Sequence, residues 1–478
     1  MAGVERMTRD EGMIPNVLAE RYASSAMCRI WSREEKVRRE RLLWIEVMKA
    51  QSRHGFNISK DQIARYEENV GNIDLSAIDE RERMLKHDVK ARIEEFNHLA
   101  GLELIHLGLT SRDLTENVEL IQIRDALKVI EAEVLGVLRL LSKRIEEYKE
   151  LVIVGRSHNI PAQLTTLGKR FASIAEELLF AFERLDSLMK RLPLRGLRGP
   201  MGTSQDLRDL VGVEATQVES EVTKSLGFDR VLDSTGQVYP RSIDFEVIST
   251  LIQLSAAPSN LAILVRLMSG AGLLSEGLSE GQVGSSAMPH KINPRSSERI
   301  NGLSVVLKGY LSMASEVAGD QWNEGDVSCS VVRRVCLPDA FFTADGIFQT
   351  VATILAEITV VEEAIEKEVD SHLSLLATSA LLMEVVKKGM GREEAHSVIQ
   401  RESIAYLKSW QSGEGSSFAE ALARDPLFPL SQGEIENIIR SVRLGPSVVD
   451  EHITRVQARI FKVLESTDSI LVPWREIL

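Results

Sequence analysis

The spacing of proline residues is the sequence feature that most restricts the fold of this chain. None of its 13 prolines lies between Pro15 and Pro161, and none lies between Pro338 and Pro426. Proline disrupts helix interiors because it lacks an N–H group and its ring clashes with the preceding turn. Two such gaps permit unusually long helices.

Apolar residues fill the first gap at helical spacing. They recur at steps of three or four at Leu120, Ile123, Leu127, Ile130, Val134, Val137, Leu141 and Ile145. This stripe predicts one helix of about eight turns or more, with a single face turned toward a core. Further helices are predicted over about 170–191, 339–367 and 245–270, the last kinked at Pro258.

Strands with alternating polarity are scarce, so the predicted fold class is mainly α, with three helical domains. We expect an N-terminal helical domain over 1–112 and a C-terminal helical domain over 365–478. Between them, 113–364 should form a central long-helix bundle that carries a polar loop at 284–294.

The composition limits the partners. Acidic residues outnumber basic ones by 70 to 57, a net charge of −13, which argues against nucleic acid or a membrane as partner. No apolar run of about 18 residues predicts a membrane span. The three cysteines, Cys28, Cys329 and Cys336, are too few for a disulfide framework, and no secretion signal precedes them, so we expect a cytoplasmic protein. No motif for a protein-bound metal or a nucleotide-binding glycine loop is present.

Four segments are richer in polar groups than packing requires: 85–89, 106–113, 155–169 and 284–294. In the second, Thr110 and Ser111 precede a helix, where they would cap it, bind an anion, or do both. In the third, His158 could exchange protons near pH 7 or be a structural histidine, and the same choice applies to His87 and His106.

The fourth segment crowds two serines, a histidine, a lysine and an asparagine between glycines and prolines, which is typical of a loop. It is either a solvated loop or a catalytic one. A serine acting as a base would need its alkoxide stabilised by about 1.4 kcal/mol for each unit of pKa lowering. Lys291 and the loop N–H groups could supply this.

This loop, GSSAMPHKINP, resembles the GSSxMPxKxN signature of the fumarase/aspartase superfamily. Every fixed position matches, at Gly284, Ser285, Ser286, Met288, Pro289, Lys291 and Asn293. The resemblance implies a mainly α fold of three domains whose long helices form the core of a homotetramer. Active sites in that family are shared between subunits.

Other segments resemble the adenylosuccinate lyases of this superfamily: RYAS from Arg21, KHDV from Lys86, HLGLTS from His106, GRSHN from Gly155, GQVYPR from Gly236 and SVVRR from Ser330. The likeness extends from about residue 15 to about residue 400. It implies β-elimination of fumarate from adenylosuccinate and from succinylated aminoimidazole carboxamide ribotide (SAICAR), a small-molecule nucleotide substrate in each case, with no cofactor.

The resemblance also implies roles for single residues. Ser285 would remove the proton from the succinyl Cβ, and His158 would protonate the leaving nitrogen. The substrate-binding positions would be Arg21, Tyr22, Lys86, His87, Asp88, His106, Thr110, Ser111, Gln163, Gln237, Ser286, Lys291, Asn293, Arg299, Ser330 and Arg334. Lys86 replaces the more common Arg, and residues 323–326 (NEGD) stand where many family members have an Arg.

Three alternatives remain at this stage. Carboxymuconate cycloisomerases can share the MPHK form of the loop, although KHDV and GQVYPR argue against that activity. An inert helical scaffold needs none of Ser285, His158, Lys291 and Asn293. A serine hydrolase would need a GxSxG turn, which we do not find.

Overall fold

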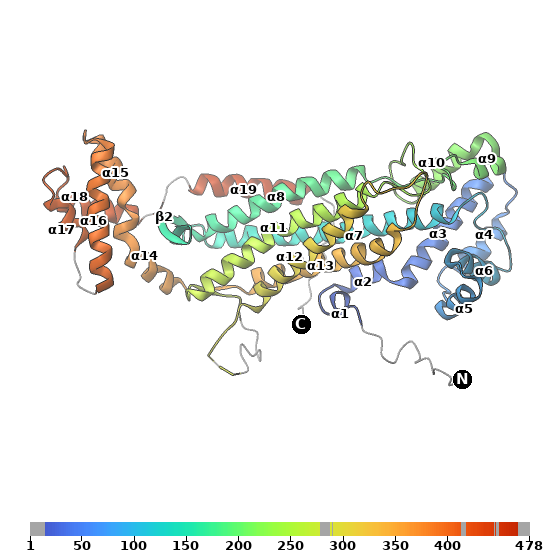
Figure 1. Ribbon diagram of the computed structural model, residues 1–478, viewed down its shortest axis with the longest axis horizontal. Helices are drawn as coiled ribbons and strands as arrows, with labels where there is room; N and C mark the ends of the chain where they lie inside the picture. Colours follow the sequence, from blue (N-terminus) through green and yellow to red (C-terminus); the bar gives the residue numbers. More distant parts are fainter. Residues whose placement is uncertain are drawn as a thin grey trace.

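The computed structural model describes residues 15–277, 287–288, 290–412, 417–443, 445 and 449–466. Helices dominate this part of the chain, and they form an elongated body (Figure 1). Its centre is a bundle of five long helices, α7 (Ser111–Glu147), α8 (Leu167–Arg191), α11 (Ser242–Gly270), α12 (Arg295–Val317) and α13 (Cys329–Glu357).

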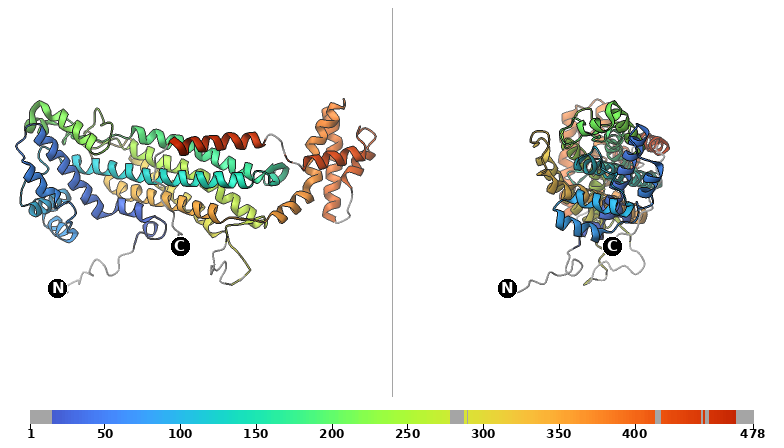
Figure 2. Two further views of the ribbon diagram at one scale, coloured as in Figure 1. Left: turned by 180° about the vertical axis from the view of Figure 1, so that it is seen from behind. Right: turned by 90° about the vertical axis from the view of Figure 1, so that its right-hand side faces the viewer.

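The longest helix, α7, confirms the interpretation of the apolar stripe. Its 37 residues extend for about 55 Å. Leu127, Val134 and Leu141 of the stripe are fully buried in the main hydrophobic core, which the other long helices share. The stripe is long because α7 runs through the bundle from one end to the other, as the left view in Figure 2 shows.

The predicted helix over 339–367 is wrong at both ends. Helix α13 begins at Cys329, so Pro338 lies inside it rather than before it. It ends at Glu357, where the strand β4 (Thr359–Val360) pairs with β3 (Leu274–Ser275) before α14 begins. Proline in a helix costs one hydrogen bond and some strain, and burial of this helix in the bundle outweighs that cost.

The N-terminal part combines α1 (Val17–Arg21), α2 (Ser25–Trp31), α3 (Arg33–Arg53), α4 (Lys60–Glu67), α5 (Leu75–Leu85) and α6 (Asp88–Ala100). The segment with α9 (Gln205–Val211), the 3-10 turn η1 (Gly212–Glu214) and α10 (Ala215–Ser225) packs into the same core, with Leu207 and Val218 buried beside Trp44. The predicted first domain, 1–112, therefore omitted the segment from α9 to α10, which comes from the middle of the chain and packs into the same core.

The C-terminal part contains α14 (Glu362–Leu376), α15 (Thr378–Lys387), α16 (Arg392–Ser412), α17 (Phe418–Arg424) and α18 (Gln432–Val442). Helices α15 to α18 share a small core of their own, whereas the buried residues of α14 belong to the main core. The last helix of this part, α19 (Val449–Ser466), instead lies along the bundle (Figure 1), and Val449, Ile453 and Ile460 join the main core. The predicted domain 365–478 therefore divides, because the apolar face of α19 finds its partner on α7 and α8.

Two helical stretches, Ser242–Gly270 and Glu362–Lys387, are long and apolar enough to cross a membrane by length and composition. In α11 this composition reflects packing, because Leu251, Leu254 and Val265 are fully buried in the bundle. The second stretch comprises two helices, α14 and α15, which meet at Ala377.

Candidate active site

A cleft of about 1080 Å³ opens at the end of the bundle where α7 begins. Residues from α3, α5, α6, α7 and α13 line it. Seven of the predicted substrate-binding residues are among them: Lys86, His87, Asp88, Ser111, Gln237, Ser330 and Arg334. The structure therefore brings together residues that are up to 248 positions apart in the sequence, the separation between Lys86 and Arg334.

The corner between α5 and α6 presents Lys86, His87 and Asp88 to the cleft. Lys86 ends α5 in the left-handed conformation (φ 55°), and His87 caps α6 by accepting a hydrogen bond at Nδ1 from the Lys90 N–H at 3.2 Å. Asp88 opens α6 and accepts from Arg92 at 3.2 Å. Burial is the largest single influence and raises the pKa of Asp88, but Arg92, the Val89 N–H and Lys36 together outweigh burial, so the net shift of the pKa is downward and this carboxylate stays charged.

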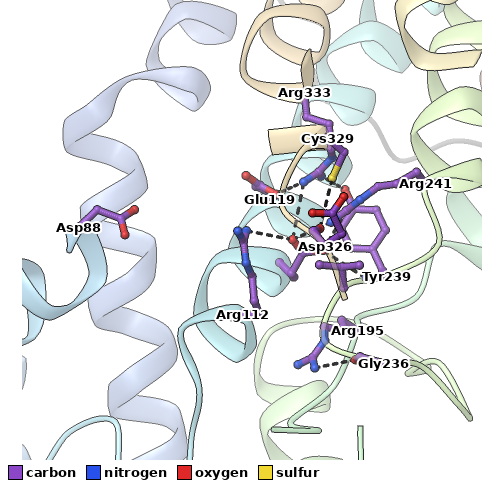
Figure 3. Close-up of polar contacts among 12 residues, drawn as sticks. Asp88, Arg112, Glu119, Arg195, Gly236, Tyr239, Arg241, Asp326, Cys329 and Arg333 are labelled. Carbon is purple, nitrogen blue, oxygen red and sulfur yellow. Dashed lines mark hydrogen bonds and ion pairs between the residues drawn. The ribbon is translucent and has the colours of Figure 1, made fainter. Parts of the chain in front are cut away.

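A buried network of charges forms the wall of the cleft beside Ser330 and Arg334 (Figure 3). The Arg333 side chain is 3% exposed and contacts two carboxylates, Asp244 at 2.6 Å and Glu119 at 2.8 Å. Its guanidinium also donates to the Tyr239 hydroxyl, which in turn donates to Asp244 at 2.7 Å. Burial is the largest single influence and disfavours the charge on Glu119, but Arg333, Lys36 and Arg241 together outweigh burial and lower the pKa of Glu119 to about 2.

A second layer of this network surrounds Glu116 at the start of α7. Both its carboxylate oxygens lie 2.9 Å from the Arg241 guanidinium, and one also accepts from the Tyr239 N–H. Arg112 reaches the same carboxylate at 3.4 Å. One turn earlier, buried Asp113 pairs with Arg195. These contacts fix the first turns of α7 against the segments that carry Gln237 and Arg333.

The sequence analysis did not assign roles to Glu116, Glu119, Asp244 or Asp113. A signal was available, because Glu116 and Asp113 lie beside apolar residues of α7 that are themselves buried. A charged residue in such a position is buried only when it is paired. Periodicity alone could not identify its partner, since Arg241 and Arg333 are more than 100 residues away.

The departure from the family pattern at 323–326 has a structural explanation. Here the Glu324 carbonyl accepts a hydrogen bond of 2.6 Å from the Gln237 N–H. A Cβ atom at Gly325 would lie only 2.5 Å from the Cβ of Gln237. A side chain at position 325 would therefore collide with Gln237, and this segment instead holds Gln237 at the cleft.

A second group of predicted residues lies outside the cleft, around α1 and the start of α12. The Arg299 guanidinium stands 5.8 Å from the ring of Tyr22, and it lies close enough to Arg21 for that charge to lower the pKa of Arg299, after the larger effect of burial. Lys291 is exposed and Asn293 half-buried just before α12. The Glu276 carboxylate accepts from the N–H groups of Ser296 and Ser297, so it joins the two ends of the signature loop.

Ser285 and Ser286 lie outside the described residues, so the choice between them as the base stays a prediction. Two other predicted residues are not in the cleft. Thr110 is the N-cap of α7, as the capping interpretation expected, and its N–H donates to Asp113 at 2.8 Å. His106 accepts a hydrogen bond of 3.0 Å from Trp44, and burial lowers its pKa to about 4, which keeps it neutral.

His158 belongs to a third group, on a hairpin that the sequence analysis did not predict. Strands β1 (Val152–Ser157) and β2 (Ile160–Thr166) pair across the two-residue turn His158–Asn159, in which both residues have positive φ (52° and 63°). This is the backbone of a type I′ turn, and histidine and asparagine tolerate it better than most residues. The turn holds His158 exposed at the tip. Gln163 on β2 donates to Ser379 of α15 at 2.9 Å.

The hairpin and the cleft lie at opposite ends of the bundle (Figure 1). Ser111 begins α7 and the hairpin follows its end, so the length of that helix, about 55 Å, separates them. A single chain therefore cannot bring His158 to the cleft that contains Ser111 and Arg334. Within the described residues, no group of three or more His, Cys, Asp or Glu side chains could hold a metal ion.

Two family models match the chain. One, described as lyase, matches residues 18–309, and the other, described as adenylosuccinate lyase C-terminus, matches residues 374–444. The second match extends the family likeness beyond residue 400, where the sequence analysis found that it thinned.

Curated relatives agree with the family models. Adenylosuccinate lyase of Saccharomyces cerevisiae is 32% identical, over 92% of this chain and 93% of the relative. That of Archaeoglobus fulgidus is 29% identical, over 86% and 91% respectively.

Solved structures support the fold. The 3-carboxy-cis,cis-muconate lactonizing enzyme of Pseudomonas putida superposes with a TM-score of 0.81 at 20% identity, over 94% of this chain and 99% of that one. A fumarate lyase from Mesorhizobium gives a TM-score of 0.78 at 19% identity, over 92% and 99%.

Proposed function

Since the chain belongs to the adenylosuccinate lyase family and is a lyase, we propose that it eliminates fumarate from adenylosuccinate, giving AMP, and from SAICAR, giving AICAR. The observation that carries this proposal is the cleft, which gathers Lys86, His87, Asp88 and Ser111 with Gln237, Ser330 and Arg334. Both substrates carry two carboxylates and a phosphate. Cations, hydroxyls and an amide at one end of a long helix suit such ligands.

The elimination needs a base, an acid and a site for negative charge. In the proposed mechanism Ser285 takes the proton from the succinyl Cβ, and the electron pair is held as an aci-carboxylate. Lys291, Asn293 and Ser111 stabilise that charge where it develops. The C–N bond then breaks while His158 protonates the leaving nitrogen, so fumarate and the nucleotide leave together.

The positions of these groups favour a site assembled from several subunits of a homotetramer. Three groups of residues lie apart in one chain: the cleft residues, the residues around Arg21 and Arg299, and His158 on its hairpin. Chains packed side by side along their long helices could bring one group of each kind together.

The surface of the bundle supports such an assembly. Large apolar side chains are exposed on the long helices, including Phe180 of α8 (64%), Leu267 of α11 (54%) and Val305 of α12 (69%). A monomer rarely exposes apolar side chains along several neighbouring helices unless a partner covers them.

The deciding experiment incubates the purified protein with adenylosuccinate and, separately, with SAICAR, and quantifies fumarate with AMP or AICAR. Equal release of fumarate and AMP is the expected result. A folded tetramer that releases neither would refute the proposal, and 3-carboxymuconate would then be the next substrate to test, because the fold is shared with an enzyme of that name.

A matched variant tests the role of the loop. Ser285→Ala should abolish turnover and leave substrate binding by isothermal titration intact, because only the base is removed. Ser286→Ala is its control, with the same change one residue later. Normal turnover by Ser285→Ala together with loss in Ser286→Ala would move the base to Ser286.

A further inference from the structure

The corner between α1 and α2, which carries Arg21 and Tyr22, is attached to the bundle through the buried carboxylate of Asp345. Ser24, the N-cap of α2, donates its hydroxyl to Asp345 Oδ1 at 3.0 Å and its backbone N–H to Asp345 Oδ2. Asp345 lies in α13 and is fully buried. Two donors on a single residue therefore hold the chain immediately after Tyr22.

A second acid lies against Asp345. Glu133 of α7 is buried, forms a side-chain hydrogen bond with Asp345, and accepts another of 2.6 Å from Gln349. Two carboxylates in contact cannot both ionise in a buried site. Burial, followed by the charge of Asp345, raises the pKa of Glu133 well above its usual range. Glu133 therefore keeps a proton and donates it, and Asp345 is the acceptor.

The packing around this pair leaves the corner little freedom. A Cβ atom at Gly346 would come within 2.9 Å of the Tyr22 Cβ and 3.1 Å of its carbonyl oxygen. The glycine thus lets Tyr22 lie directly on α13, next to Asp345. Earlier in the chain, Asn16 donates to Asp339 of the same helix at 2.7 Å. Helix α13 contacts the corner before, at and after Arg21 and Tyr22.

We propose that Asp345, with the proton held by Glu133, is a positioning residue that sets Arg21 and Tyr22 for binding of the nucleotide substrate. The proposal rests on the function proposed above, in which these two residues contact the substrate. Asp345 itself acts only through Ser24. It accepts all three hydrogen bonds as a carboxylate, and an amide in its place could not do so without presenting N–H groups to donors.

The pair makes the corner sensitive to a rise in pH, because the pKa of Glu133 is raised. When Glu133 loses its proton, two buried negative charges face each other and Asp345 loses a donor, so the corner should loosen and KM should rise. From α2, Cys28 also faces the pair, and its pKa is raised by burial and then by Asp345. Ser24, the N-cap of α2, and Gln349 from α13 also contact the pair, and both are neutral.

The experiment compares Asp345→Asn with Glu133→Gln in the full-length protein. Asp345→Asn should raise KM for adenylosuccinate about tenfold, with kcat within about twofold, because it disturbs binding and not the proton transfers. Glu133→Gln keeps a donor toward Asp345, so it should retain the neutral-pH KM. It should also abolish the rise in KM that the unaltered protein shows as pH increases, and Cys28→Ser controls for the thiol.

Hydrogen exchange gives a readout that does not depend on turnover. The amides of residues 17–28 should exchange faster in Asp345→Asn than in the unaltered protein, and at the unaltered rate in Glu133→Gln. Should Asp345→Asn fail to fold, Ser24→Ala replaces it, since it removes only the hydroxyl. Unchanged KM and unchanged amide exchange in Asp345→Asn would overturn the proposal. An equal rise in KM and in exchange rate in Asp345→Asn and Glu133→Gln would overturn it as well. Absence of turnover in the unaltered protein would refute the proposed function, while exchange separately reports whether Asp345 holds the corner.

Discussion

The two ends of the bundle are built in opposite ways. At the end where α7 begins, the cleft rests on buried ion pairs of Arg333, Arg241 and Arg195 with carboxylates that have lost nearly all contact with water. At the other end, His158 stands exposed on a hairpin tip, and the Arg156–Glu368 ion pair links the hairpin to α14. The first end is organised within one chain. At the second, His158 lies at the opposite end of the bundle from the cleft of its own chain.

The difference indicates where binding and chemistry are determined. Buried charge networks fix geometry because breaking one pair leaves an uncompensated charge. A histidine exposed at a hairpin tip is sterically able to enter the cleft of a neighbouring chain. The following predictions test this division.

The largest effect should come from altering one end of the bundle in one chain and the other end in another chain. His158→Asn and Arg334→Gln should each lose most activity, the first by about 10²–10⁴-fold, the usual contribution of a general acid. Asparagine suits the left-handed φ of position 158, so the hairpin should keep its shape. After the two variants are unfolded together and refolded at equal amounts, about one quarter of the activity should return, because random assembly places both intact groups in a quarter of the sites.

Failure of recovery, from mixtures that sedimentation shows to be tetrameric, would mean that each chain completes its own site. Refolding each variant alone is the control, and neither should regain activity.

The next effect concerns stability at the cleft end. Arg333→Met should lower the free energy of unfolding by about 3–5 kcal/mol in urea denaturation, since Asp244 and Glu119 would stay buried without their cation. Arg156→Met at the hairpin end is the matched control, and it should cost about 0–1 kcal/mol because that pair is partly exposed. Equal losses of unfolding free energy in the two variants would contradict the difference proposed between the two ends of the bundle.

A smaller effect should appear on acidification. The pKa of Glu119 is about 2 in the folded chain, below the ordinary 4.5, so its stabilising contribution is present above pH 4.5 and is lost as pH falls toward 2. Thermal unfolding of the unaltered protein and of Glu119→Gln should converge over this range and differ above it. A constant difference in Tm between pH 6 and pH 2.5 would exclude the ion pair as the source.

The smallest effect should come from His54, which lies between Glu214 at 3.0 Å and Glu221 at 2.8 Å and joins α3 to η1 and α10. Its hydrogen bond to Glu221 is the main cause that raises its pKa above 6.5. The raised pKa means that its stabilisation is complete at low pH and is lost as pH rises through the folded-state pKa. His54→Gln should therefore lower Tm by a few degrees at pH 5.5 and by less at pH 9, and the reverse trend would contradict the assignment.

Much of this architecture was determined by the sequence alone. A helix is specified by neighbours three and four residues apart, so the stripe from Leu120 to Ile145 was sufficient to predict α7, and 170–191 to predict most of α8. The signature loop and the polar segments were likewise visible as local patterns. The hairpin was missed because its turn residues, His158 and Asn159, are not the usual glycine pair.

Only the tertiary structure decided how these pieces combine. Nothing local indicates that Arg333 pairs with Asp244 and Glu119, that α19 returns to the bundle, or that α5 and α6 lie at the opposite end of the bundle from the β1–β2 hairpin. Ion pairs and helix packing join residues that are remote in sequence, and their energies depend on burial that no single segment specifies. Candidate residues for the chemistry could therefore be proposed from the sequence, whereas their division between a cleft and an exposed hairpin required the fold.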